Sequence, residues 1–122
     1  MKSARVGIAQ SLLRVSGPCS VAALMLLAWT PGVYMMRTGM LSGREEHFLA
    51  YLLSAMLLTA TRPSVPLASA LAFYTLLAGA LELGQNLVPG RDPALFDFVA
   101  SLAGAIVGIA ALVLIRRPVV TA

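Results

Sequence analysis

Four long stretches of the chain contain no Asp, Glu, Lys or Arg, and they dominate its pattern of polar and apolar positions. These stretches are residues 15–36, 47–61, 63–81 and 98–115. A helix needs about 20 mostly apolar residues, within a range of about 17–25, to cross a membrane. Three stretches have that length, and the second reaches it because Arg62 can extend its side chain to the membrane surface. The pattern predicts an all-α integral membrane four-helix bundle. Its spans are expected over roughly residues 17–36, 46–62, 65–85 and 96–115.

The composition indicates that this chain is surrounded mainly by lipid. Apolar residues make up 59% of it, charged residues only 11%, and the mean hydropathy is +0.87. Soluble domains are typically about 45–50% apolar and about 25% charged. At 122 residues we expect one domain, residues 1–122. The first apolar run follows a basic segment, as in a secretory signal, but no small-x-small cleavage site follows it, which favours an uncleaved first span.

The charges separate into two groups when four spans are assumed. Both termini then lie on one side, together with the loop between the second and third spans. That side holds Lys2, Arg5, Arg14, Arg62, Arg116 and Arg117. The other side holds Arg37, Arg44 and Arg91, and all five acids, Glu45, Glu46, Glu82, Asp92 and Asp97. The excess of basic residues on the first side predicts cytoplasmic N- and C-termini. Because these residues form no patch with interleaved aromatics, no nucleic-acid partner is expected.

Two segments near the first span have alternative interpretations. Residues 3–16 suit either a short helix lying at the membrane interface or the start of the first span. Pro31 and Gly32 are expected to kink or end that span near its outer end, because proline lacks a backbone donor.

Polar residues at the outer ends of the spans share faces with small residues. Spacing of i, i+4 and i+7 places Asp97 on one stripe with Ser101, Gly104 and Gly108. Glu82 and Asn86 share a face of the third span, and His47 leads to Tyr51 on the second. Small residues mark helix–helix contacts in membranes, and a charge facing lipid costs about 3 kcal/mol even on the lenient scale. We therefore expect Glu82, His47 and Asp97 to converge at the outer mouth of the bundle.

Each stripe also has a purely structural interpretation. The Gly104 and Gly108 pair could support a homodimer, or it could seat the fourth span inside its own bundle. Tyr51 could be an ordinary interfacial aromatic residue. Arg91 could pair with Asp92, Asp97 or Glu82 and hold its loop in place.

The segments GREEHFLAY (43–51) and ELGQNLVPGRDPALFDFVASLAGAIVG (82–108) resemble the VanZ-like family of small bacterial membrane proteins. The resemblance covers roughly residues 20–115. The matching positions are Arg44, His47, Phe48, Tyr51, Glu82, Gln85, Pro89, Arg91, Asp97, Gly104 and Gly108. Gly43 and Ser101 depart from the family's usual Asp and Asn, and Arg44 stands where Lys is commoner. The resemblance implies a multi-pass protein of the bacterial cytoplasmic membrane, in a family associated with low-level resistance to teicoplanin-type glycopeptides, and it implies no reaction.

The main hypothesis is an accessory protein of the bacterial envelope. Its outer polar cluster would bind the headgroup of a lipid or of a lipid-linked glycan precursor, or an amphiphilic antibiotic. Arg44 and Arg91 suit phosphate, because a guanidinium donates bidentate charge-assisted hydrogen bonds. The candidate binding residues are Arg44, His47, Tyr51, Glu82, Gln85, Asn86, Arg91, Asp97 and Ser101.

Three alternatives remain open. The chain could be a structural subunit of a larger membrane complex, with the polar cluster as internal glue. It could be an outer-leaflet enzyme with His47 as general base, oriented by Glu82 or Asp97, although no nucleophile or phosphate-loop motif accompanies it. The same residues could hold a metal ion, but their spacing is not diagnostic, so no metal or cofactor is expected. The single cysteine, Cys19, rules out an internal disulfide and a cysteine-based metal cluster.

Overall fold

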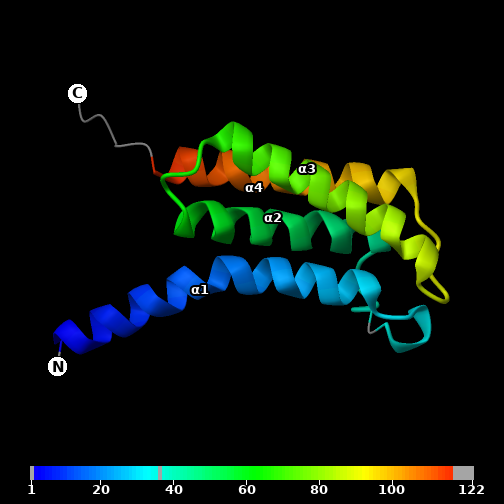
Figure 1. The fold of residues 1–122 in the computed structure, drawn as a ribbon, viewed down its shortest axis with the longest axis horizontal. Coiled ribbons are helices and arrows are strands. Elements are labelled where there is room, and N and C mark those ends of the chain that lie inside the picture. Colours follow the sequence, from blue (N-terminus) through cyan, green and yellow to red (C-terminus); the bar gives the residue numbers. More distant parts are fainter. Residues whose placement is uncertain (1, 36, 117–122) are drawn as a thin grey trace.

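A computed structural model describes residues 2–35 and 37–116, with side chains from residue 10 onward. This part of the chain consists of four α-helices and two short 3-10 helices and contains no strand. The α-helices are α1 (Lys2–Trp29), α2 (Gly43–Thr61), α3 (Leu67–Gly84) and α4 (Leu95–Ile115), and the 3-10 helices are η1 (Gly32–Tyr34) and η2 (Gln85–Leu87). Consecutive helices run in opposite directions, so that α1 begins and α4 ends at the same end of the bundle (Figure 1).

Three helices in the described part are long and apolar enough to cross a membrane. They cover Gln10–Trp29, Leu67–Leu87 and Leu95–Ile115. These helices confirm the expectation of an all-helical protein with membrane-spanning character. Helix α2 is not among them, because Arg44, Glu45, Glu46 and His47 occupy its first turn and leave an apolar run only from Phe48 to Thr61. A fourth span, and the side on which the termini lie, stay predictions.

Helix α1 differs from the expected first span at both of its ends. Residues 3–16 do not form a separate interfacial helix but are the start of the first helix, because α1 is continuous from Lys2 to Trp29. The helix ends at Trp29 and not at residue 36, because Pro31 cannot donate to the preceding turn. Gly32 then packs so closely on Gly90 of the α3–α4 loop (residues 88–94) that a Cβ atom there would overlap the Gly90 carbonyl oxygen. The backbone N–H of Gly32 donates to Pro89 O at 3.1 Å.

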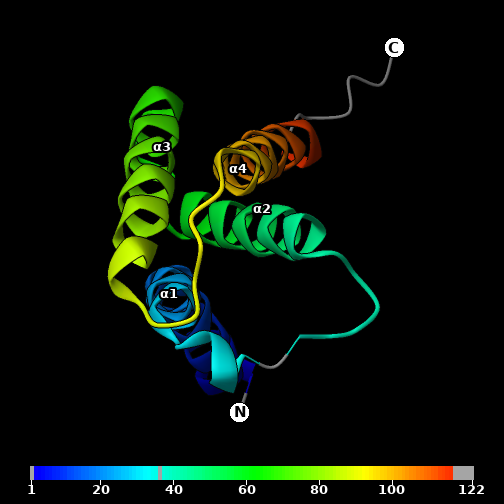
Figure 2. The ribbon, with the colours of Figure 1, turned by 90° about the vertical axis from the view of Figure 1, so that its right-hand side faces the viewer.

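Helix α2 lies between α1 and α4 and packs most extensively on α4, with α3 beside α4 (Figure 2). The contact is close because Gly104 and Gly108 face the α2 backbone directly. A Cβ atom at Gly104 would overlap the carbonyl oxygen of Phe48, and one at Gly108 would overlap that of Leu52. The glycine pair therefore seats α4 within its own bundle, which is the second of the two interpretations. A homodimer through the same residues stays a prediction.

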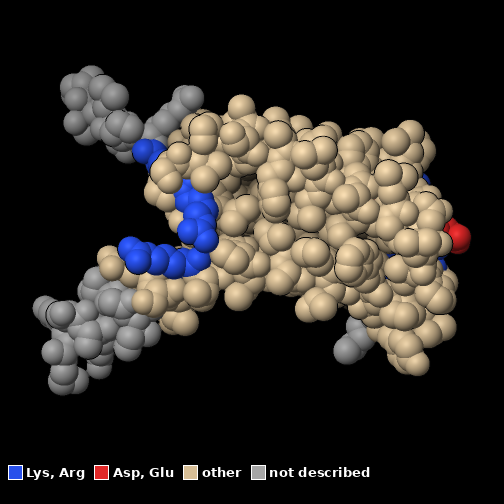
Figure 3. Space-filling model, viewed as in Figure 1, with Lys and Arg blue, Asp and Glu red and all other residues tan. Residues whose placement is uncertain are grey.

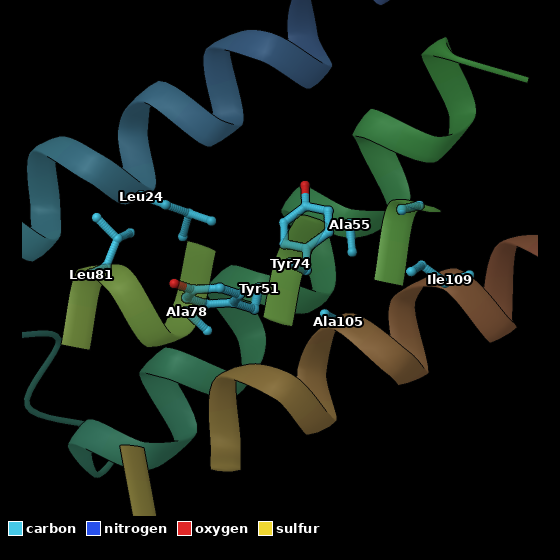
Figure 4. Close-up of a cluster of buried hydrophobic side chains, with 9 residues drawn as sticks. Leu24, Tyr51, Ala55, Tyr74, Ala78, Leu81, Ala105 and Ile109 are labelled. Carbon is cyan, nitrogen blue, oxygen red and sulfur yellow. The ribbon is translucent and has the colours of Figure 1, made fainter. Parts of the chain in front are cut away.

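The core combines small residues with two tyrosines (Figure 4). Tyr51 is only 5% exposed and meets Tyr74 edge to face, with ring centroids 6.1 Å apart. It is thus a core residue and not an interfacial aromatic. The hydroxyl of Tyr74 bonds to Ser54 at 2.8 Å, and Ser54 bonds to Ser20 of α1 at 2.9 Å. This buried chain of hydroxyls connects α1, α2 and α3, as expected where water cannot satisfy polar groups.

Charged residues gather at the two ends of the bundle and leave its flank uncharged (Figure 3). Arg62 and Arg116 follow the last turns of α2 and α4, and Arg116 donates to Ala60 O at 2.9 Å. We call this the basic end. All five acids lie at the other end, where α2 and α4 begin and α3 finishes, and we call it the acidic end. The side chains of Lys2, Arg5 and Arg117, which the sequence places at the basic end, lie outside the described part.

Candidate functional site

A cavity of about 510 Å³ opens at the acidic end of the bundle. Its apolar wall consists of Leu24, Leu27 and Ala28 of α1, Leu49 and Ala50 of α2, Leu81 of α3 and Leu41 of the α1–α2 loop. Ionisable side chains also line it: Arg37, Glu46, His47, Glu82, Arg91, Asp92 and Asp97. The lining of the cavity therefore combines an apolar wall with charged side chains.

Six of the nine predicted binding residues line this cavity. They are His47, Tyr51, Glu82, Gln85, Arg91 and Asp97. The structure thus brings Glu82, His47 and Asp97 together as the helical stripes predict. That these residues bind a ligand stays a prediction.

The other three predicted residues do not line the cavity. Ser101 is only 2% exposed and lies behind His47. Arg44 is turned onto the ring of Phe96, with its guanidinium carbon 4.9 Å from the ring centroid. Asn86 is exposed and donates to Leu83 O at 3.0 Å, which satisfies a carbonyl at the end of α3. Arg44 and Asn86 thus have local structural partners instead of a place in the site.

His47 connects α2 with α4 through both of its ring nitrogens. Nδ1 lies 3.2 Å from Ser101 Oγ, and Nε2 lies 4.0 Å from Asp97 Oδ2. The His47 and Asp97 side chains are each about one quarter exposed, whereas Ser101 is buried. In the tautomer with a proton on Nε2, Nδ1 accepts a hydrogen bond from Ser101, and Nε2–H faces Asp97 across a distance too long for a hydrogen bond. Ser101 orients His47 in this arrangement and has no access to a substrate as a nucleophile.

Glu82 ties the end of α3 to the start of α4. It is 8% exposed, and its Oε1 accepts a hydrogen bond from Ala94 N at 2.6 Å. Glu82 also borders a second, apolar groove of about 420 Å³ between α3 and α4, lined by Gly79, Leu83, Pro93, Ala94, Leu95 and Phe98. The Glu82 side chain therefore lies between the cavity and an apolar groove.

Replacing Glu82 with alanine is expected to destabilise the protein by about 1–3 kcal/mol, because the Ala94 N–H loses its acceptor in a partly buried place. Glu82→Gln keeps an acceptor oxygen at the same position and should cost clearly less. Thermal unfolding of the purified variants in detergent measures the difference. Equal melting temperatures for Glu82→Ala and Glu82→Gln would show that this hydrogen bond contributes little.

Arg91 binds the carboxyl end of α1, which corrects the partners expected from the sequence. Its Nε donates to Thr30 O at 3.1 Å, and its Nη2 donates to Leu27 O at 2.6 Å and contacts Met35 Sδ at 3.2 Å. In the described part of the chain it makes no ion pair within 4.0 Å with Asp92, Asp97 or Glu82. A cation at the end of a helix is favourable because the last carbonyls carry partial negative charge.

Burial lowers the pKa of the Arg91 guanidinium, and repulsion from Arg37 lowers it further, whereas Glu82 and Asp97 act in the opposite direction. Arg91 thereby secures the α3–α4 loop onto α1, beside the close contact between Gly32 and Gly90. The loop is seen crossing the end of α1 in Figure 2. The structural role that the sequence allowed for Arg91 is present, with backbone carbonyls as its partners.

The sequence interpretation missed three charged residues of the lining. Arg37, Glu46 and Asp92 were used to compare the charges of the two sides, and Asp92 also as a possible partner of Arg91, but none of them was predicted to bind a ligand. Glu46 Oε1 accepts from both the N–H and the hydroxyl of Thr38, at 3.0 and 2.8 Å, and so folds the α1–α2 loop over the cavity. The sequence did offer one signal for Arg37 and Glu46. The loop between the first two spans joins their outer ends, so both ends of this loop must lie near the outer mouth of the bundle.

No group of three or more His, Cys, Asp or Glu side chains in the described residues has an arrangement that could hold a metal ion. Comparison with known protein families, curated proteins and solved structures gives no match to this chain. The resemblance to the VanZ-like family therefore stays a prediction based on the residues quoted above.

Proposed function

We propose that this protein is a membrane protein of the bacterial envelope that binds an amphiphilic molecule in the cavity at its acidic end. The ligand would be a phospholipid, a lipid-linked glycan precursor or an amphiphilic antibiotic. The single observation that carries the proposal is the lining itself, an apolar wall combined with charged side chains. A volume of about 510 Å³ falls within the range of about 300–1,000 Å³ that is typical of small-molecule sites.

The proposal places the acidic end at the outer face of the cytoplasmic membrane, with α2 as a fourth span and both termini in the cytoplasm. The packing of α2 supports this arrangement, because α2 runs antiparallel to α1 between α1 and α4 (Figure 1). Its charged first turn lies at the mouth of the cavity, where it remains next to water. The excess of basic residues at the other end agrees with the positive-inside rule.

The alternative of a purely structural cluster predicts that the polar side chains satisfy one another across helices. Glu82, Gln85 and Arg91 instead bond to backbone groups. Side-chain contacts within the described lining are those of Glu46 with Thr38, of Arg91 with Met35 and of His47 with Asp97. The absence of one polar network among the described lining residues favours the binding hypothesis over internal glue.

Arg37 and Arg44 provide a matched test of the proposal. Both are exposed arginines at the acidic end, but only Arg37 lines the cavity, whereas Arg44 lies over Phe96. We expect Arg37→Gln to lower the occupancy of the co-purifying amphiphile about fivefold, because an exposed charged contact contributes about 1 kcal/mol. Arg44→Gln should leave the occupancy unchanged.

Native mass spectrometry of the protein extracted with its own lipids measures the bound molecule directly. Because both variants lose one positive charge, a difference between them cannot come from a general effect of charge on lipid association. If both variants retain the same bound amphiphile as the unmodified protein, the cavity is not its site and the proposal is wrong.

A further inference from the structure

The cavity keeps charges of both signs without pairing them. The acids that line it are Glu46, Glu82, Asp92 and Asp97, and the arginines are Arg37 and Arg91. In the described part of the chain, the one contact within 4.0 Å between a basic and an acidic side chain is that of His47 with Asp97. A lining that has unpaired positive and negative charges is complementary to a ligand that carries a positive and a negative group.

The two arginines form the positive part of the lining. They come from separate loops and line the same cavity, and repulsion from Arg37 lowers the pKa of the Arg91 guanidinium, after the larger effect of burial. Nε and Nη2 of Arg91 are occupied by α1, and its Nη1 has no hydrogen-bond partner among the described residues. Two neighbouring guanidinium groups repel each other, and a phosphate group relieves this repulsion by accepting from both.

The negative part of the lining keeps free acceptor oxygens. Among the described residues, the Asp97 carboxylate has only the His47 Nε2 contact at 4.0 Å, and Glu82 uses Oε1 but has a second carboxylate oxygen. Gln85 is buried and directs its amide nitrogen to Ala28 O at 3.5 Å, which leaves its amide oxygen as an acceptor. A primary ammonium group supplies three donors and a positive charge, and so matches these acceptors.

Two other headgroup classes fit less well. A quaternary ammonium group has no donor and is recognised by aromatic faces, but Tyr51 is the one aromatic residue among the described residues of the lining. An anionic headgroup without an ammonium group would face four acids against two arginines. The arrangement thus favours phosphate and primary ammonium in one molecule.

We propose that the cavity recognises a zwitterionic phosphoethanolamine group, with phosphate on Arg37 and Arg91 and ammonium on Asp97 and Glu82. This inference rests on the proposed function and specifies its ligand class. The group occurs in a membrane phospholipid and also as a free soluble compound. The apolar wall, with Leu24, Leu27 and Leu81, would contact the glycerol and the first methylenes of the lipid form.

The test is a titration of the full chain in detergent with three phospholipids that share their acyl chains. The headgroups are phosphoethanolamine, phosphocholine and phosphoglycerol, and native mass spectrometry measures each apparent Kd. We expect the phosphoethanolamine lipid to bind about tenfold more tightly than the other two, which corresponds to about 1.4 kcal/mol. This ratio is measured on the unmodified protein and does not depend on how a variant folds.

Two variants separate the two parts of the lining. Asp97→Asn keeps the shape of the side chain and should reduce the binding of phosphoethanolamine lipid to the level of phosphoglycerol lipid. Arg37→Gln should weaken the binding of all three phospholipids, because all carry phosphate. Soluble phosphoethanolamine is added as a competitor in the final experiment. We expect it to displace the phosphoethanolamine lipid only at a concentration much higher than that of the lipid. Tighter binding of the soluble compound would identify it, and not the lipid, as the ligand.

The outcomes distinguish this inference from the proposed function. Equal affinities for the three lipids, all lowered by Arg37→Gln, would overturn the zwitterionic specificity and support an amphiphile site of broader range. Binding that is unaffected by Arg37→Gln and by Asp97→Asn would overturn both.

Discussion

Gly104→Ala is expected to disrupt the packing of α4 on α2 and to lower the melting temperature of the protein markedly. The new methyl group would occupy the place of the Phe48 carbonyl oxygen, so one helix backbone must move away from the other. Overpacking of this kind costs about 1–3 kcal/mol, and here backbone atoms are displaced, which places the effect at or above the upper end. The general helix preference for alanine, about 1 kcal/mol, acts in the opposite direction and is too small to compensate.

Gly79→Ala is the matched control, because Gly79 is also a helical glycine in a span of high hydropathy. A Cβ atom at Gly79 would meet only Phe98 Cε2, at 3.7 Å, which is an ordinary contact. This variant should be as stable as the unmodified protein or slightly more stable. Thermal unfolding in detergent compares the two, and a Gly104→Ala variant as stable as Gly79→Ala would contradict the observed packing. A loss of dimer with an unchanged melting temperature would instead support the homodimer.

Arg91→Ala is expected to release the α3–α4 loop from α1. The variant loses the charge-assisted hydrogen bonds to Thr30 O and Leu27 O and leaves both carbonyls without that donor. Hydrogen bonds to charged groups contribute about 1.5–3 kcal/mol each when buried, and because Arg91 is partly exposed we expect a total loss of about 2 kcal/mol. The same change removes one of the two cations of the cavity, so binding should fall together with stability.

Arg91→Lys and Arg44→Ala control for this result. Lysine keeps the charge but lacks the planar fork that reaches two carbonyl oxygens, so it should restore stability only in part. Arg44→Ala removes an arginine of the same end that stacks on Phe96, and it should change the melting temperature little. If Arg91→Ala loses binding and keeps its melting temperature, Arg91 is a ligand-binding residue only, and its role on α1 is minor.

The positions of side chains on helices could be predicted from the sequence, because helical periodicity determines them. The stripe from Asp97 through Ser101 to Gly104 is correct for this reason, and Asp97 and Ser101 meet His47 as the inward faces require. The ends of α2, α3 and α4 also lie close to the predicted ends of their spans, because charged residues mark them, whereas both ends of α1 differ from the prediction.

The loops could not be predicted in the same way, because their backbone follows no repeat. Arg37 and Arg44 both precede the second apolar run, and composition gives no reason to prefer one. The structure turns Arg44 onto Phe96 and leaves Arg37 in the cavity lining. Arg91 likewise reaches α1, more than 60 residues earlier, because the contact between Gly32 and Gly90 brings the two loops together. No pattern within either loop indicates that contact.

The close contact of Gly104 and Gly108 with the α2 backbone also bears on the order in which the helices assemble in a membrane. Helix α2 has the shortest apolar run of the four helices, and its closest neighbour, α4, begins more than 30 residues after α2 ends. During synthesis from the N-terminus, α2 leaves the ribosome before the helix on which it packs most extensively. We therefore expect α2 to be integrated late, after α4 has been made, with the two helices entering as a pair and the cavity forming in that final step.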